Sequence, residues 1–152
     1  MLFQYLLHGG VYAMIRQATA DDWKEISSLL DLLGYPNTGS FIKGNIEKLI
    51  AHPDEELMVY EDEGRVVACI SLHYIPQLAL PGDIACISYL VVDSTTRSTG
   101  IGREVEEYAS QAAKKRNCDR IQVHCHSRRV DAHRFYNRQG FSESPKYFTK
   151  ML

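Results

Sequence analysis

The chain lacks any long run of one charge. Its 152 residues hold 17 Lys and Arg against 19 Asp and Glu, for a formal net charge of −2. Without a cluster of Lys and Arg, neither a nucleic-acid interface nor a patch for anionic membranes is expected. The length predicts one domain, and the 45% hydrophobic and 24% charged residues are typical of a soluble globular protein.

Positive charge is also missing from the start of the chain. Residues 1–13 contain short apolar stretches but no Lys or Arg. We therefore expect neither a secretory signal peptide nor a membrane span there. Met14 resembles a natural domain start. The sequence predicts an N-terminal extension over 1–13, either non-native or packed as an edge segment, and one domain over 14–152.

Closely spaced cysteines are absent as well. The four cysteines are Cys69, Cys86, Cys118 and Cys125, and no two form a C-x-x-C pair. This spacing favours reduced, buried thiols in a cytoplasmic protein over a disulfide framework. The chain also has no internal repeat, linker or low-complexity tract.

Apolar periodicity predicts an alternation of strands and helices. The expected elements are a strand over 14–18, a helix capped by Thr19 and ending at Gly34, a helix over 41–50, strands over 56–61, 65–75 and 84–92, a helix over 100–116, a strand over 120–126, a helix over 131–139 and a strand over 146–151. The order β-αα-βββ-α-β-α-β indicates an α/β fold, with one mixed sheet and helices on its faces. The strand over 84–92 is apolar on both faces, as expected at the centre of a sheet.

A glycine-containing turn follows that central strand, with the sequence Arg97-Ser98-Thr99-Gly100-Ile101-Gly102. Backbone N–H groups converge at a strand–turn–helix junction, and the helix dipole favours an anion such as a diphosphate. Gly100 and Gly102 let the backbone approach that anion closely. Because Val105 stands three residues after Gly102 and no G-K-S/T follows, the dinucleotide fingerprint and the P-loop are both excluded.

A second motif, Ala132-His133-Arg134-Phe135-Tyr136-Asn137-Arg138-Gln139-Gly140-Phe141, follows about thirty residues later. The first motif matches Q/R-x-x-G-x-G/A, and the second matches A-x-x-F-Y-x-x-x-G-F. Together they resemble the GNAT superfamily of acyl-CoA-dependent N-acyltransferases, over residues 14–152. The resemblance implies an acetyl-CoA-dependent N-acetyltransferase whose central strands splay apart at the cofactor site.

The resemblance also implies how the cofactor is held. Backbone groups of Leu90, Val91 and Val92 would pair with the pantetheine arm, and one N–H would stabilise the oxyanion of a tetrahedral intermediate. The remaining implied cofactor contacts are Arg97, Ser98, Thr99, Gly100, Ile101, Gly102, Arg103, Arg129 and Phe135. Arg129 stands where many relatives carry an Asn. Together with Arg128 it could engage phosphate or an acidic substrate group, or the two could form a solvated pair.

Tyr136 occupies the family's general-acid position, where a phenol would protonate the departing thiolate. The alternative is a half-buried tyrosine bonded to backbone. Many family members carry a Glu base on the central strand, but the matching residue here is Ser88, which cannot act as a base unaided. Ser88 and Tyr89 could order a water chain. The alternatives nearby are His73, Tyr74 and Asp83.

The segment His124-Cys125-His126 places two His on one face of the predicted strand and Cys125 on the other. With no third ligand identifiable, we expect no metal site, and a strand that flanks the acceptor pocket explains the segment better. Tyr35 lies in the loop between the first two helices, which often covers the acceptor in this family. It could contact substrate or be an exposed loop aromatic.

The leading hypothesis is a transfer of acetyl from acetyl-CoA to a primary amine by direct attack, because no nucleophile elbow is evident. The alternative is a non-catalytic acyl-CoA-binding sensor or regulatory module. Small-molecule amines are favoured over amino acids and peptide acceptors, with weak support for cationic ones from the net acidity. Dimers are common among relatives, so a homodimer is compatible with the resemblance.

Overall fold

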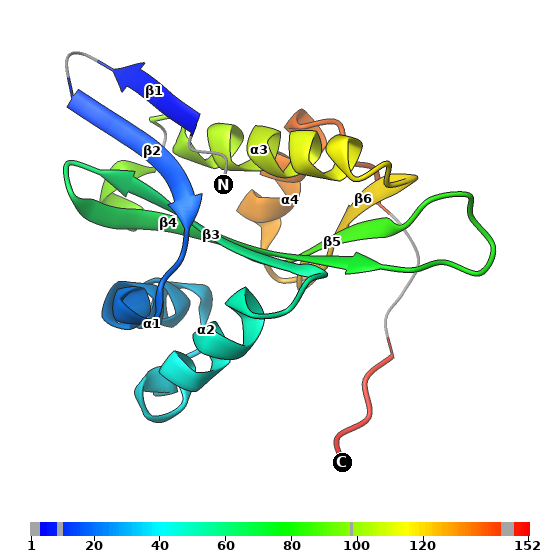
Figure 1. Ribbon diagram of the computed structural model, residues 1–152, viewed down its shortest axis with the longest axis horizontal. Coiled ribbons are helices and arrows are strands. Elements are labelled where there is room, and N and C mark those ends of the chain that lie inside the picture. The colour runs from blue at the N-terminus through cyan, green and yellow to red at the C-terminus, as the bar shows by residue number, and fades with distance from the viewer. Residues whose placement is uncertain (1–3, 9–10, 98, 144–147) are drawn as a thin grey trace.

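The structure is a computed structural model that describes residues 4–8, 11–97, 99–143 and 148–152, with side chains from Ala13 onward. In the described residues one sheet has the strand order β1-β2-β3-β4-β5-β6 (Figure 1). The strands are β1 Gln4–His8, β2 Val11–Gln17, β3 Glu55–Asp62, β4 Arg65–Ile75, β5 Ile84–Val92 and β6 Arg120–Val123. All neighbours pair antiparallel except β5 and β6, which run parallel.

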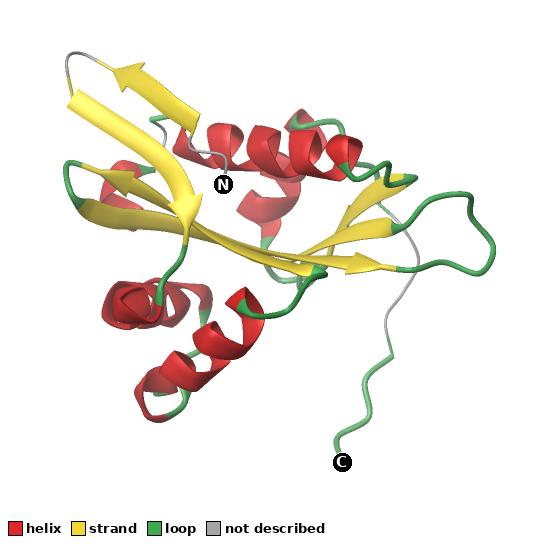
Figure 2. Ribbon diagram, in the orientation of Figure 1, coloured by secondary structure: helices red, strands yellow, loops and turns green. Residues whose placement is uncertain are grey.

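Helices cover both faces of the sheet (Figures 1 and 2). Helices α1 (Trp23–Leu33) and α2 (Ile42–Ile50) lie on one face, while α3 (Ile101–Lys115) and α4 (Val130–Arg138) lie on the other. Short 3-10 turns occur at Ala20–Asp22, Thr38–Ser40 and Ser94–Thr96. The single mixed α/β domain predicted from the sequence is confirmed.

Strand β4 is buried on both faces because it separates two apolar clusters. Ile70 and Leu72 pack with residues of α3, whereas Cys69 packs with residues of α1 and α2. Alternate residues of a strand point to opposite faces, so one apolar run supplies both cores.

An ion pair fixes the start of the first helical segment. Arg16 of β2 bonds both carboxylate oxygens of Asp22 at 2.8 Å and one oxygen of Glu61 at 2.7 Å. Asp22 also accepts the backbone N–H of Thr19 at 2.7 Å. Thr19, predicted as the cap of the first helix, caps the 3-10 turn Ala20–Asp22 that precedes α1. These bonds hold the start of the helical segment against the end of β2.

Two predicted strands differ from the structure. The predicted strand over 120–126 stops at Val123, because β5 diverges from β6 beyond this point. The predicted strand over 146–151 is wrong for its described part: residues 148–152 pair with no described strand, and Phe148 and Met151 are exposed. Apolar residues specify a strand only where a sheet edge is available to pair with them. Lys146 and Tyr147 lie outside the described residues.

At the other end of the chain, β1 pairs with β2 along the edge of the sheet, with Gln4 opposite Ile15 and His8 opposite Val11. The first strand of the predicted domain therefore begins at Val11 instead of Met14. No helix in the described chain is long and apolar enough to span a bilayer.

Candidate active site

A β-bulge interrupts β5 at Ser88. Tyr89 pairs with Ser71 and Ile87 pairs with Leu72, so Ser88 has no partner on β4. On the other side, the pairing of β5 with β6 ends at Ile87 and Val123. Within the described residues, the second half of β5 therefore has β4 on one side and no strand on the other. The predicted splaying of the central strands is present at this point.

The bulge also sets the direction of the backbone groups that follow it. The carbonyl of Ile87 accepts the His124 N–H at 3.5 Å, on the β6 side, while the Asp93 N–H donates to Val67 of β4 at 2.7 Å. Amides alternate in direction along a strand, so counting back from Asp93 turns the Leu90 and Val92 N–H groups toward the open side. By the same count the N–H of Val91 points to β4.

The turn after β5 leads into α3 through a left-handed residue. Gly100 has φ of 95° and is the N-cap of α3. The first intrahelical bond runs from the Glu104 N–H to the Gly100 carbonyl at 3.1 Å. The N–H groups of Ile101, Gly102 and Arg103 therefore have no acceptor within the helix, as at every helix start. Arg97 and Thr99 are exposed in this turn, and Ser98 lies outside the described residues.

The two sequence motifs meet in space. A Cβ atom on Gly102 would lie 3.4 Å from the ring of Phe135 and 3.7 Å from Val92. The Phe135 ring stacks edge-on against Tyr136 at 5.2 Å, and Tyr136 stacks similarly against Phe141 at 5.4 Å. Gly102 thus lets α3 pack closely on α4, and this packing positions Tyr136.

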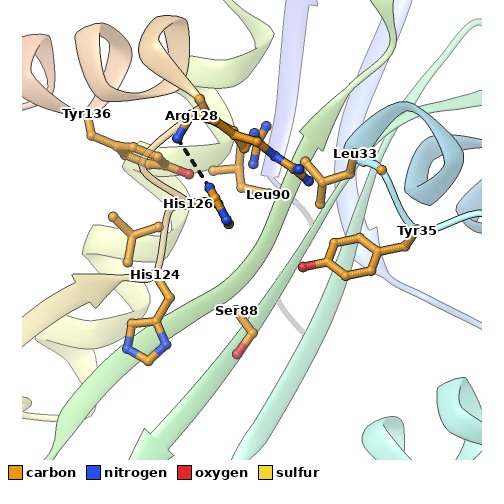
Figure 3. Close-up of a pocket in the computed structure, with 11 residues that line it drawn as sticks. Leu33, Tyr35, Ser88, Leu90, His124, His126, Arg128 and Tyr136 are labelled. Carbon is orange, nitrogen blue, oxygen red and sulfur yellow. Dashed lines mark hydrogen bonds between the residues drawn. The ribbon is translucent and has the colours of Figure 1, made fainter. Parts of the chain in front are cut away.

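A cavity of about 110 Å³ opens beside the bulge (Figure 3). Ser88 and Leu90 of β5 form one side of it, and Tyr136 of α4 forms another. Its remaining lining residues are Leu33, Gly34, Tyr35, Val123, His124, His126, Arg128 and Arg129. The hydroxyl ends of Tyr35 and Tyr136 both point into this space from opposite sides.

Tyr136 is buried, with an exposed fraction of 8%. Its hydroxyl makes no hydrogen bond with any described side chain. Burial raises the pKa of Tyr136 well above its usual range; Cys125 and Glu106 raise it further and Arg129 opposes them. A phenol in these surroundings keeps its proton at neutral pH and has that proton available inside the cavity.

Most of the residues considered as bases lie elsewhere. His73 forms an ion pair with Glu55, and the Tyr74 hydroxyl donates to Glu56 at 2.9 Å. Neither lines the cavity, nor does Asp83, whose backbone carbonyl accepts the Asp119 N–H. Of the residues predicted for this role, Ser88 lines the cavity, and Tyr89 packs edge-on against Tyr35 at 5.5 Å.

The segment from His124 to His126 follows β6 instead of belonging to it. Both His line the cavity. The Nε2 atom of His124 lies 3.6 Å from the Cys86 sulfur, and burial, with the charge of His73, lowers the pKa of His124. The sequence predicts that His124 lies near the acceptor but gives it no chemical role. The bulge, which cannot be recognised from the sequence, brings Ser88 and His124 to the same cavity.

Across the described residues, no three His, Cys, Asp or Glu side chains gather where they could hold a metal ion. Cys69, Cys86, Cys118 and Cys125 are free thiols. The polar side chains that line the cavity carry hydroxyl, imidazole and guanidinium groups.

Comparison with known proteins places this site in a family. The family model of the acetyltransferase (GNAT) family matches residues 17–141. The chain belongs to this family. The matched range includes the bulge, the turn, the cavity and Tyr136, and the prediction of an acetyl-CoA-dependent N-acetyltransferase is confirmed.

One curated relative is aminoalkylphosphonate N-acetyltransferase of Salmonella typhimurium, 29% identical over 139 residues, which are 91% of this chain and 90% of the relative. The crystal structure of a transcriptional regulator from Bacillus halodurans matches this structure with a TM-score of 0.85 and 26% sequence identity. The match covers 92% of this chain and 99% of the regulator chain. An aminoglycoside N-acetyltransferase solved in complex with CoA has a TM-score of 0.82 and 11% identity, with 97% and 99% coverage, and shows a shared fold. The chain is thus a GNAT acyltransferase that uses acetyl-CoA and an amine.

Proposed function

We propose that this GNAT protein transfers acetyl from acetyl-CoA to the primary amine of a small molecule, by direct attack at the cavity beside Ser88. The observation that carries the proposal is the position of Tyr136. Its protonated hydroxyl points into a cavity whose other side is the interrupted strand β5. The curated relative acts on aminoalkylphosphonates by its name, which favours a small acceptor over a protein.

Two groups of backbone amides fit the co-substrate. The turn from Arg97 to Arg103 would hold the diphosphate at the N-terminus of α3, where the helix dipole and the unbonded N–H groups favour an anion. The open side of β5 would pair with the pantetheine arm through Leu90 and Val92. Acetyl-CoA supplies an activated thioester at the end of that arm. Val91, whose N–H points to β4, would contribute packing only.

Tyr136 is the proposed general acid. In the breakdown of the tetrahedral intermediate, the C–S bond breaks, the electron pair stays on sulfur, and the phenol proton moves to that sulfur. The N–H of Leu90 is turned toward the open side of β5, where it would stabilise the oxyanion. Arg129, beside Tyr136, opposes the rise in its pKa and so eases this proton release.

His124 is the proposed proton acceptor for the amine, with Ser88 ordering an intervening water. An ammonium group with a pKa near 10.4 must lose a proton before it can attack. The lowered pKa of His124 keeps its imidazole neutral at pH 7 and so able to accept that proton. The sequence alone did not identify the general base, and its candidates lay in or next to the central strands.

A non-catalytic sensor is the alternative, and the regulator from Bacillus halodurans is a structural neighbour. Release of free CoA thiol in the presence of a panel of amines separates the two. We expect turnover with at least one small amine and a sharp loss of it in Tyr136→Phe. If acetyl-CoA binds saturably but no amine causes release of free thiol, the acetyltransferase proposal is wrong and the sensor is the better interpretation.

A further inference from the structure

The charge of the cavity differs from the charge of the whole chain. The chain has a net charge of −2, yet no Asp or Glu is found among the residues that line the cavity. Arg128 and Arg129 do line it, together with His124 and His126. Guanidinium groups keep their charge at every physiological pH, so the described wall of the cavity is cationic.

Both arginines lack a carboxylate partner within the described chain. Other arginines do have one: Arg16 pairs with Asp22, and Arg116 pairs with Asp54 at 2.7 Å. Two neighbouring guanidinium groups repel each other, and this cost is relieved when an anion lies between them.

The loop that carries the two arginines is held in place by hydrogen bonds to the side chain and the backbone of His126. The Arg128 N–H donates to Nδ1 of His126 at 3.2 Å (Figure 3). The Arg129 N–H donates to the His126 carbonyl at 3.0 Å. Arg129 then accepts the His133 N–H at 3.1 Å and is the N-cap of α4. The charges are therefore presented from an ordered turn, beside the positive end of a helix dipole.

The position of the pair identifies which ligand it serves. The cavity includes Ser88 and Leu90 but no described residue of the turn from Arg97 to Arg103. In the proposed arrangement the diphosphate lies at that turn, and the thioester lies near Tyr136. The arginine pair consequently lies at the reacting end of the site, where the acceptor enters.

We propose that the acceptor is a primary amine that also carries an anionic group, a phosphonate, phosphate or carboxylate, and that Arg128 and Arg129 hold this group. The inference rests on the proposed function and names the acceptor class for the same site. With the anion on the arginines, the amine would extend toward Ser88 and His124. A polyamine or an aminoglycoside would bring positive charge to a cationic wall and be repelled by it. The net acidity of the chain, which gave weak support for cationic acceptors, therefore does not describe the cavity.

The experiment compares acceptors of similar length with the full chain and saturating acetyl-CoA: aminoethylphosphonate, beta-alanine, n-propylamine and diaminopropane. We expect kcat/KM to be at least about 10-fold higher for one of the two anionic amines than for n-propylamine, and lowest for diaminopropane. Arg128→Ala should lower kcat/KM for the anionic amine by about 10- to 100-fold, as for loss of a hydrogen bond to a charged group, while kcat/KM for n-propylamine is little affected. Arg129→Ala should lower kcat/KM for n-propylamine as well, because Arg129 eases proton release from Tyr136, but the loss should be at least about 10-fold larger for the anionic amine.

Arg138→Ala is the matched control, because Arg138 is an exposed arginine at the end of α4 that does not line the cavity. It should leave the preference for anionic amines intact. Equal use of neutral and anionic amines by the wild type would overturn the inference. A rise in the KM for acetyl-CoA alone in the arginine variants would also overturn it and assign the pair to the co-substrate.

If no amine supports thiol release, the proposed function fails, and calorimetry tests the anion site separately. Aminoethylphosphonate titrated into the CoA-saturated protein should then still bind to the wild type and bind at least about 10-fold more weakly to Arg128→Ala. Equal or absent binding in both proteins would refute the anion site as well.

Discussion

A Cβ atom added to Gly82 would lie 2.4 Å from the carbonyl oxygen of Asn117 and 2.9 Å from the backbone nitrogen of Asp119. The loop before β5 thus touches the loop before β6 through bare backbone. Next to this contact, the Asp119 N–H donates to the Asp83 carbonyl at 2.8 Å, and the pairing of β5 with β6 begins. The pairing of β5 with β6, which ends at the cavity, therefore begins beside a contact that only glycine permits.

Gly82→Ala should destabilise the protein, because backbone atoms on both loops must move to admit the methyl group. We expect a loss of about 1–3 kcal/mol in the free energy of unfolding, measured by urea denaturation. Gly44→Ala is the control, since a Cβ at this α2 position meets nothing within 4 Å. That substitution should stabilise the protein by about 0.5–1 kcal/mol, and equal effects of the two would contradict the close approach.

Gly100→Ala should weaken acetyl-CoA binding. An L-residue at φ of 95° is strained. Relaxing that strain would turn the first N–H groups of α3 away from the proposed diphosphate position, so we expect the KM for acetyl-CoA to rise. Gly64→Ala tests strain alone, because Gly64 has φ of 75° in the turn between β3 and β4. Both variants should lose about 1–2 kcal/mol of stability. An unchanged KM in Gly100→Ala would remove the turn from the binding site.

Tyr136→Phe should lower kcat by about 10²- to 10⁴-fold, because it removes the proposed proton donor for the departing sulfur. The KM for acetyl-CoA should change little, since the ring and its stacking on Phe135 remain. Tyr60→Phe is a matched control: Tyr60 is also buried, but its hydroxyl donates to Glu104 at 2.7 Å and lies away from the cavity lining. Comparable losses of kcat in both would argue for a structural effect.

The pH profile of kcat/KM should report on His124. Its pKa is lowered from the ordinary value by burial and by His73, so the neutral, proton-accepting form persists down to pH values below about 6.5. Activity should fall as the pH drops through the lowered pKa, since protonated imidazole cannot accept a proton. His124→Gln should abolish this acid limb and lower the plateau, whereas His126→Gln should retain the limb. Persistence of the limb in His124→Gln would exclude His124.

Most of the fold could be predicted from the sequence because the apolar periodicity is strong. The central strand over 84–92 is found with the predicted bounds, and α1 ends at Gly34 in a left-handed cap. The strand over 146–151 could not be judged from its own residues, because strand formation depends on an available edge. The start of β2 depends on its pairing with β1, which the composition of residues 1–13 does not reveal.

The site was predictable to the extent that the motifs define it. The spacing of Gly102 and Phe135 indicated a shared site, and the structure brings these residues into contact. The charge of the cavity was not predictable from the net charge, because acidic residues are distributed over other surfaces. The role proposed for His124 depends on where the pairing of β6 with β5 ends. That point is set by the tertiary structure and cannot be predicted from the local sequence.

Ser88 is an extra residue in β5, so the alternation of backbone directions along the strand is interrupted at this position. Before it, alternate backbone amides bond to β6. After it, every second amide faces a side on which the described residues place no strand. In the proposed arrangement, one strand therefore belongs to the sheet at its beginning and pairs with a co-substrate at its end.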